Sequence, residues 1–171
     1  MSPTPTDTPA GADLGSQVAR LHHTLGRWAR SDAGAHAELR RSVPGQIPAI
    51  GLWKLLVQCD IDPRTEAEER GWALLAWTLA SLGGTESRQP IGRALQGAGL
   101  SELRLVRLLR ADAGQLPDAL TAAVRQIMAK GGNGDALQLA RLVLTGPDSE
   151  AGERIRRQIA KDYYRAERTT A

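Results

Sequence analysis

Two short helices joined by a glycine-rich turn occupy residues 91–112 and set the fold class of this chain. The stretch reads IGRALQGAGLSELRLVRLLRAD, with the first helix over 91–96, the turn over 97–99 and the second helix opening at Ser101. Leucines at helical spacing predict one buried face, and the glycines end the first helix. Three explanations are open for the arginines of the second helix: reading DNA bases, holding a nucleic-acid backbone, or solvating a surface.

The same helical periodicity continues outside this pair. Apolar residues recur three or four positions apart, and no run with a period of two is long enough for a strand. The chain is therefore predicted to be all-α, a compact bundle of eight or nine helices, with two sub-bundles as an alternative arrangement. The other expected helices cover residues 16–30, 35–42, 47–59, 62–82, 117–130 and 135–144, with a last one after residue 148.

Two local predictions concern the segment between residues 47 and 82. Asp62 followed by Pro63 has the form of a helix start, an N-cap carboxylate before a proline at the first helical position. The preceding helix is short and strongly apolar, so its core-facing side must be chosen from several candidates. The residues predicted to be buried there are Ile50, Trp53, Leu56 and Val57.

Composition places the chain among globular proteins with a polyanionic partner. Of its 22 basic residues most are arginine, and its pI of about 9.5 fits binding to an acidic molecule. Residues 1–14 are proline-containing and poor in large apolar side chains, so they are expected to be disordered, with residues 15–168 forming a single helical domain. No signal peptide or membrane span is expected, which together with a single cysteine favours a cytoplasmic location.

The sequence predicts no enzyme, no metal site and no cofactor. His22, His23 and His36 lack the spacing of a metal-binding helix, and Cys59 has no histidine near it in sequence. The glycines of GGNG, residues 131–134, follow a helix instead of a strand and lack the lysine of a phosphate-binding loop. We therefore expect structural histidines, a buried thiol and a turn.

Arginines are the remaining candidates for function. Arg104, Arg107 and Arg110 fall within an arc of roughly 120° on a helical wheel. A spacing of three places neighbouring side chains about 5–6 Å apart, close to the spacing of phosphates, so an anion could offset their repulsion. A solvated face, or ion pairs to acids such as Asp112, is the equally weighted alternative. The opposite, buried arc is predicted to hold Leu105, Val106, Leu108 and Leu109.

A base-reading helix-turn-helix fits residues 91–112 less well than backbone binding does. The motif places a small residue four positions before the turn glycine, whereas Ala94 lies five positions before Gly99. The arginines run along the second helix instead of gathering at its start, and that helix has no Asn or Gln suited to adenine. A free-standing helix-turn-helix regulator and a purely structural helical adaptor remain the alternatives.

The order of motifs resembles the CasB family, the small subunit of the type I-E CRISPR Cascade complex. The motifs are ELRRS, IPAIGLWKLL, a tryptophan-bearing helix opened by DPR, IGRAL, ELRLVRLLRAD and IAKDYYRAE. The resemblance spans roughly residues 16–166, and the shared order and spacing of these motifs make it specific.

The resemblance implies a non-catalytic subunit that holds the R-loop through arginines, while guide RNA reads the target sequence. It implies as partners the other Cascade protein subunits, crRNA, target DNA and a second copy of the chain lying head to tail. The residues that match the family's basic positions are Arg41, Arg64, Arg104, Arg110 and Arg93, the last with a buried contact to an acid as an equal alternative. Local inference adds Arg40, Arg107 and Arg125, and more weakly the group Arg154, Arg156 and Arg157.

Overall fold

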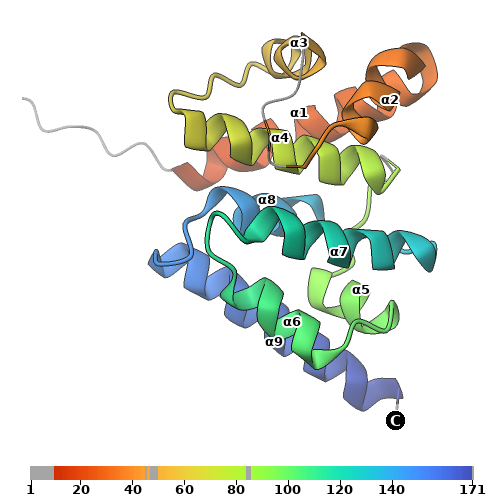
Figure 1. Ribbon diagram of the computed structural model, residues 1–171, viewed down its shortest axis with the longest axis vertical. Coiled ribbons are helices and arrows are strands. Elements are labelled where there is room, and N and C mark those ends of the chain that lie inside the picture. Colours follow the sequence, from red (N-terminus) through yellow and green to blue (C-terminus); the bar gives the residue numbers. More distant parts are fainter. Residues whose placement is uncertain (1–9, 45, 47–49, 84–85, 171) are drawn as a thin grey trace, which may run out of the picture.

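The computed structural model describes residues 10–44, 46, 50–83 and 86–170, and this part of the chain contains nine α-helices and no strand (Figure 1). The prediction of an all-α bundle with eight or nine helices is therefore confirmed. The helices are α1 (Ala10–Ser31), α2 (Ala33–Arg41), α3 (Ile50–Gln58), α4 (Glu66–Ser81), α5 (Ile91–Gly97), α6 (Glu102–Arg110), α7 (Leu116–Ala129), α8 (Ala136–Leu144) and α9 (Glu150–Thr170).

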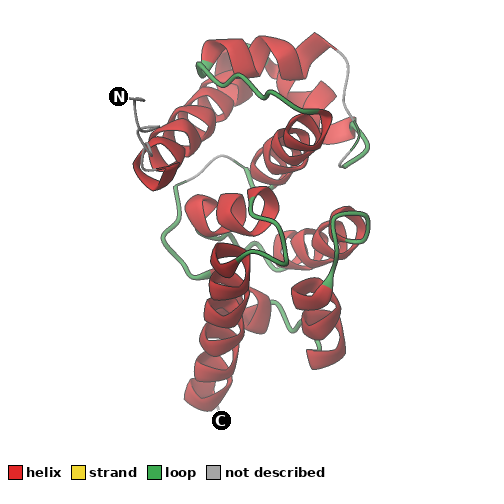
Figure 2. Ribbon diagram, turned by 90° about the vertical axis from the view of Figure 1, so that its left-hand side faces the viewer, coloured by secondary structure: helices red, strands yellow, loops and turns green. Residues whose placement is uncertain are grey.

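The helices form two neighbouring groups that share one core. Helices α1 to α4 lie at one end of the molecule and α5, α6 and α9 at the other, with α7 and α8 between them (Figure 1). Figure 2 shows the same division from the side, with the end of α9 far from α1. Because α4 packs on both α7 and α8, and α8 also packs on α1 and α9, the buried residues of the two groups join into one contiguous cluster.

The tightest helix pair is α5 with α9, and a glycine permits it. A side-chain carbon added at Gly92 would collide with the backbone carbonyl oxygen of Ile159 and the backbone nitrogen of Tyr163. Backbone atoms cannot move aside as a flexible side-chain tip can, so only glycine fits at this position. The second residue of the motif IGRAL must therefore be glycine for α5 to pack on α9.

The core-facing side of α3 was predicted wrongly at three of four positions. Leu56 is buried as expected, but Ile50 is 82% exposed, Val57 is 76% exposed and Trp53 is exposed as well. Leu52 and Leu55 face the core instead. The side of α3 that carries Trp53 and Val57 also carries the polar pair Lys54 and Gln58, four positions apart, which marks it as solvent-facing. The prediction followed the large apolar side chains instead of this polar pair.

The start of α4 was also predicted wrongly. Asp62 and Pro63 precede the helix, and Thr65 is its N-cap, with Oγ1 accepting a hydrogen bond from the backbone N–H of Glu68 at 3.2 Å. The Glu68 carboxylate in turn accepts a hydrogen bond from the backbone N–H of Arg64 at 2.7 Å. These two hydrogen bonds provide acceptors for two backbone N–H groups at the helix start. The Asp62 carboxylate, four residues before Glu66, is not the cap of this first turn.

The first helix begins earlier than expected. α1 starts at Ala10, inside the stretch predicted to be disordered, and Leu14 packs against the core. The expectation is thus corrected for residues 10–14, while residues 1–9 lie outside the described part of the chain. At the other end α9 continues to Thr170, two residues beyond the expected boundary. Across the described ranges, no helix is long and apolar enough to cross a membrane.

Replacing Gly92 with alanine should destabilise the protein by about 1–3 kcal/mol or more, because the new methyl group would push α5 away from α9. Urea unfolding followed by circular dichroism measures this. Gly97 is the matched control: it ends the same helix and an added side-chain carbon there meets nothing within 4 Å. Gly97→Ala should leave stability unchanged or raise it by up to about 1 kcal/mol. Equal losses in the two variants would contradict the close approach.

Candidate nucleic-acid interface

The three α6 arginines line one groove between α6 and α7. Arg104, Arg107 and Arg110 are all exposed, and the groove that they border has a volume of about 830 Å³. The structure thus brings together the three arginines that the helical wheel placed on one arc. The other residues lining the groove are Val106, Gln115, Asp118, Ala119 and Ala122.

Hydrogen bonds from α7 and α9 fix the turn from which α6 begins. The buried Tyr163 hydroxyl of α9 donates to the backbone carbonyl of Leu100 at 2.5 Å. The Gln126 amide of α7 donates to the backbone carbonyl of Ala98 at 3.1 Å, and its oxygen accepts from Arg104 Nη1 at 3.0 Å. Because both turn carbonyls are held, the position of α6 and of its first arginine follows from the packing of α7 and α9.

The groove carries a net positive charge. Three arginines face one acid, Asp118, and the structure records no ion pair for Arg107 or Arg110 among the residues it describes. Asp112, the acid considered as a partner, instead accepts hydrogen bonds from the backbone N–H groups of Gly114 and Gln115, both at 2.9 Å. The structure therefore does not show the alternative in which Asp112 pairs with these arginines.

The apolar side of α6 differs from the prediction at Val106. Leu105 and Leu108 are buried and Leu109 is half-buried, but Val106 is exposed and lines the groove. Leu103, which was not singled out, is 63% exposed and falls among the arginines on the helical wheel. The reason is that only a narrow strip of α6 is covered by α7 and α9, so the apolar residues at its margins stay in solvent.

The remaining predicted arginines lie away from this groove. Arg40 and Arg41 are exposed in the last turn of α2, and Arg64 is exposed just before α4, all in the group of helices that does not contain α6. Arg125 is exposed on α7, beside Gln126 in sequence, but does not line the groove. The structure therefore groups only the three α6 arginines at one groove, and the other predicted arginines lie elsewhere on the surface.

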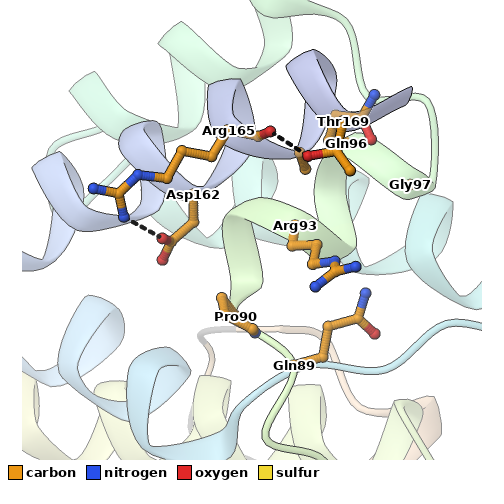
Figure 3. A pocket seen from close by; sticks show the side chains of 9 residues that line it. Gln89, Pro90, Arg93, Gln96, Gly97, Asp162, Arg165 and Thr169 are labelled. Carbon is orange, nitrogen blue, oxygen red and sulfur yellow. Dashed lines mark hydrogen bonds and ion pairs between the residues drawn. The ribbon is translucent and has the colours of Figure 1, made fainter. Parts of the chain in front are cut away.

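Arg93 lines a second hollow, of about 450 Å³, between α5 and α9 (Figure 3). Its side chain is exposed, so the alternative of a buried contact to an acid is not observed. Asp162, the acid nearby, pairs with Arg165 at 3.6 Å, as the dashed line in Figure 3 marks. Arg165 was missed because its place beside Arg93 depends on how α9 crosses α5, for which the local sequence gives no signal.

The weaker group on α9 divides into two environments. Arg154 and Arg157 are exposed and pair with Glu150 and Glu153 one turn earlier. Arg156 lies between them in sequence and is buried. Arg156 is buried because it lies beside Ile155 on the face of α9 that packs on the core. A helical wheel would place it there, but the run of basic residues suggested a surface position.

Cys59 and His22 are buried, His36 is half-buried with its Nε2 lacking a hydrogen-bond partner among the described residues, and His23 is exposed. Cys59 is buried, and this burial raises the pKa of its thiol, which favours the neutral form. Burial, followed by the charge of Arg40, lowers the pKa of His36. Within the described ranges no three His, Cys, Asp or Glu side chains are placed to hold a metal ion.

Together the fold and the groove define an all-helical protein with an arginine-lined surface. The family model for the CRISPR-associated protein Cse2 matches residues 35–164, so the chain belongs to the Cse2 family. Cse2 is the small subunit of type I-E Cascade, also called CasB, and the resemblance found in the sequence is confirmed.

A solved structure of similar fold supports the same architecture. It is the crystal structure of a CRISPR-associated protein of the Cse2 family from Thermus thermophilus, with 24% sequence identity and a TM-score of 0.69. The match covers 87% of this chain and 98% of that one, so the likeness extends over nearly the whole of both folds. Among curated proteins, none matches the sequence.

Tyr163→Phe should reduce stability at pH 7 by about 1 kcal/mol, because the Leu100 carbonyl loses its donor. Burial, then the nearby Glu167 and Glu102 carboxylates, raises the pKa of Tyr163 above its ordinary value of 10.0. The stability that the neutral hydroxyl provides is complete below the pKa of the unfolded chain and is lost as the pH rises through the higher folded pKa. Urea unfolding from pH 8 to 11 should therefore show the two proteins converging above about pH 10. A constant difference across that range would contradict the assignment.

Proposed function

We propose that this chain is the non-catalytic small subunit of a Cascade surveillance complex, in which its arginines bind nucleic-acid backbone and stabilise the R-loop. Membership of the Cse2 family supports the place in Cascade. The observation that carries the rest is the groove between α6 and α7, where three exposed arginines face a single acid. The proposal includes crRNA, target DNA and a second, head-to-tail copy of the chain as partners, and a cytoplasmic location.

Backbone binding accounts for the arrangement of the arginines better than base reading does. Their spacing of three along α6 sets neighbouring Cβ atoms about 5–6 Å apart, close to the separation of successive phosphates along a strand. Arg104 is also oriented by Gln126, which reduces the loss of side-chain freedom on binding. Contacts of this kind hold a strand in place without reading its sequence. Pairing with the guide RNA reads the sequence instead.

The margin of α6 adds an apolar contribution to strand binding. Leu103 and Val106 are exposed among and beside the arginines. An unpaired strand presents apolar sugar and base surface as well as phosphates, so a mixed basic and apolar ridge suits a single strand better than a duplex, whose outer surface is dominated by phosphates. The displaced strand of the R-loop is therefore the partner that we assign to this ridge.

Replacing Arg104, Arg107 or Arg110 with alanine should weaken binding of a single-stranded DNA of mixed sequence by about fivefold to tenfold each. The dependence of log affinity on log salt should become shallower by about 0.7 for each phosphate contact removed. Fluorescence anisotropy at several salt concentrations measures both. Arg70→Ala is the matched control, since Arg70 is an exposed α4 arginine that is already paired with Glu66. It should leave affinity and salt slope nearly unchanged.

Two outcomes would replace the proposal with one of its alternatives. Losses that depend on the DNA sequence, or enrichment of a motif when the chain selects from random duplexes, would indicate a helix-turn-helix regulator. No binding of single-stranded DNA even at low salt would indicate a structural adaptor. In a crRNA-loaded complex, Arg41→Ala and Arg64→Ala should also weaken R-loop binding uniformly across targets.

A further inference from the structure

A groove runs along α4 where the two groups of helices meet. One part is a cleft of about 510 Å³ between the starts of α1 and α4 and the loop that joins α8 to α9. The other part is a hollow of about 600 Å³ between α4, the start of α7 and the residues after α2. The two parts adjoin, and we call them together the α4 groove. The lining residues that they share are Ala67, Gly71, Ala113, Leu116 and Val143.

Apolar side chains in the α4 groove remain accessible to solvent. Leu14, Val143 and Leu144 are half-buried, and Val43 is 57% exposed. Removing apolar surface of this kind from water is favourable, so it promotes contact with another molecule. Each part of the groove also falls within the range of roughly 300–1,000 Å³ that is typical of ligand-binding clefts.

The charge of the α4 groove is opposite to that of the whole chain. The chain has a formal net charge of +3, yet acids outnumber arginines by five to two among the residues that line the groove. Neither arginine is free to meet a ligand, since Arg70 pairs with Glu66 and Arg156 is buried. The groove therefore repels a polyanion and attracts a cationic group. The five acids, all exposed, are Asp13, Glu66, Glu68, Asp112 and Asp118.

Helix capping accounts for single acids of this set but not for their convergence on one groove. The Asp112 carboxylate accepts hydrogen bonds from two backbone N–H groups before α7, and Glu68 accepts one from the backbone of Arg64 before α4. Each bond concerns one helix start, whereas the packing of α1, α4 and α7 brings acids from three helix starts together. The same bonds hold two carboxylates in place in the free chain, which lowers the entropy cost of binding.

An extended basic and apolar occupant fits these walls better than a single cation does. Across the described ranges no three His, Cys, Asp or Glu side chains are placed to hold one metal ion, so the acids are spread along the groove. A polypeptide segment in which Arg or Lys alternates with apolar residues can pair with separate acids and cover the apolar walls at the same time. The α6 ridge of this chain has such chemistry, but the proposed function assigns it to DNA, so the occupant is a different polypeptide.

We propose that the α4 groove is a docking site for a basic and apolar segment of a partner protein. Arg or Lys side chains of the partner pair with Asp13, Glu68 and Asp112, and its apolar side chains cover the apolar walls. Among the lining residues the α4 groove shares only Asp118 with the arginine groove of α6, so a protein and a nucleic-acid strand bind at neighbouring but different places. The inference goes beyond the proposed function, and only the choice of a different chain over a second copy rests on it.

The test titrates the full chain at low ionic strength with the peptide acetyl-Leu-Arg-Leu-Arg-Leu-amide. In NMR spectra the peptide should shift the backbone amide resonances of Glu68, Gly71 and Ala113, which line the groove. It should bind about tenfold more tightly than the uncharged acetyl-Leu-Gln-Leu-Gln-Leu-amide. It should also bind more tightly than acetyl-Ser-Arg-Ser-Arg-Ser-amide, which keeps the charges but lacks apolar side chains.

Two triple variants with the same change in net charge locate the acids that bind the peptide. Asp13→Asn, Glu68→Gln and Asp112→Asn together keep the size of the side chains and their oxygen acceptors, and they should remove most of the tenfold preference for the basic peptide. The control triple variant changes exposed acids of α9 that do not line the groove, and it should preserve the preference. The control changes are Glu150→Gln, Glu153→Gln and Glu167→Gln.

A second pair of variants tests the apolar walls. Val43→Ser should weaken the basic peptide about threefold, because it removes apolar surface that the peptide covers. Val57→Ser is the matched control, since Val57 is 76% exposed on α3 and does not line the groove. If the groove triple variant does not fold, Asp13→Asn at an exposed position of α1 and its control Glu167→Gln provide the same comparison.

Equal binding of the charged and uncharged peptides, or equal losses in each variant and its control, would overturn the proposal. Sedimentation velocity of the full chain tests the other occupant. A dimer that the groove variants dissociate and the control variants do not would assign the groove to a second copy, and it would overturn the proposal as well. None of these measurements involves DNA, so a failure of the proposed function is detected separately.

Discussion

The close approach of α5 and α9 is the constraint on which the arginine surface depends. With glycine at position 92 the α5 backbone lies directly against the α9 backbone at Ile159 and Tyr163. This contact brings the Tyr163 hydroxyl within hydrogen-bonding distance of Leu100, at the turn that leads into α6. Since α6 is short and only a strip of it is buried, its orientation comes from this turn and not from its own stability. The placement of the three arginines thus depends on a backbone contact between two other helices.

Arginines in this chain serve different purposes because their surroundings differ. On α6 they are exposed, share a groove and face little negative charge, which suits an extended polyanion. On α9, Arg154 and Arg157 are exposed but are paired with acids one turn earlier, so their charge is largely offset within the helix. Arg156, between them, is buried, and two of its nitrogens have no hydrogen-bond partner among the described residues. A count of basic residues would treat these positions alike, whereas burial and neighbouring charge separate the exposed, unpaired arginines of α6 from the paired and buried arginines of α9.

The sequence predicted well where one face of a helix is distinct from the other. Ile155, Ile159 and Tyr163 are spaced four apart on an otherwise polar helix, and all three are buried. On α3 the large apolar side chains of Ile50 and Val57 share the solvent-facing side with Lys54 and Gln58, so a prediction based on apolar side chains chose the wrong side, whereas Leu52 and Leu55 are buried. At the start of α4, Asp62–Pro63 is a strong local signal, but the reciprocal bonds of Thr65 and Glu68 provide a better cap three residues later.

At the candidate site, too, the sequence predicted what belongs to a single helix and missed what depends on how helices pack. The arc of Arg104, Arg107 and Arg110 could be found from the wheel alone, because it is a property of one helix. The groove beside it, the bond from Arg104 to Gln126 and the hollow that joins Arg93 with Arg165 all depend on how separate helices cross. The cleft around Arg156 could not be predicted for the same reason, since its walls come from both groups of helices.

Site-specific crosslinking from α6 tests most directly whether this ridge lies against nucleic acid. A photoreactive p-benzoylphenylalanine placed at Leu103, which is exposed among the arginines, would report what covers the ridge in a crRNA-loaded complex bound to target DNA. Covalent linkage to the displaced strand, at positions that do not change with target sequence and that disappear when Arg104, Arg107 and Arg110 are replaced with alanine, is the predicted result. Linkage only to a protein subunit, unaffected by those substitutions, would contradict the assignment of the ridge to nucleic-acid backbone.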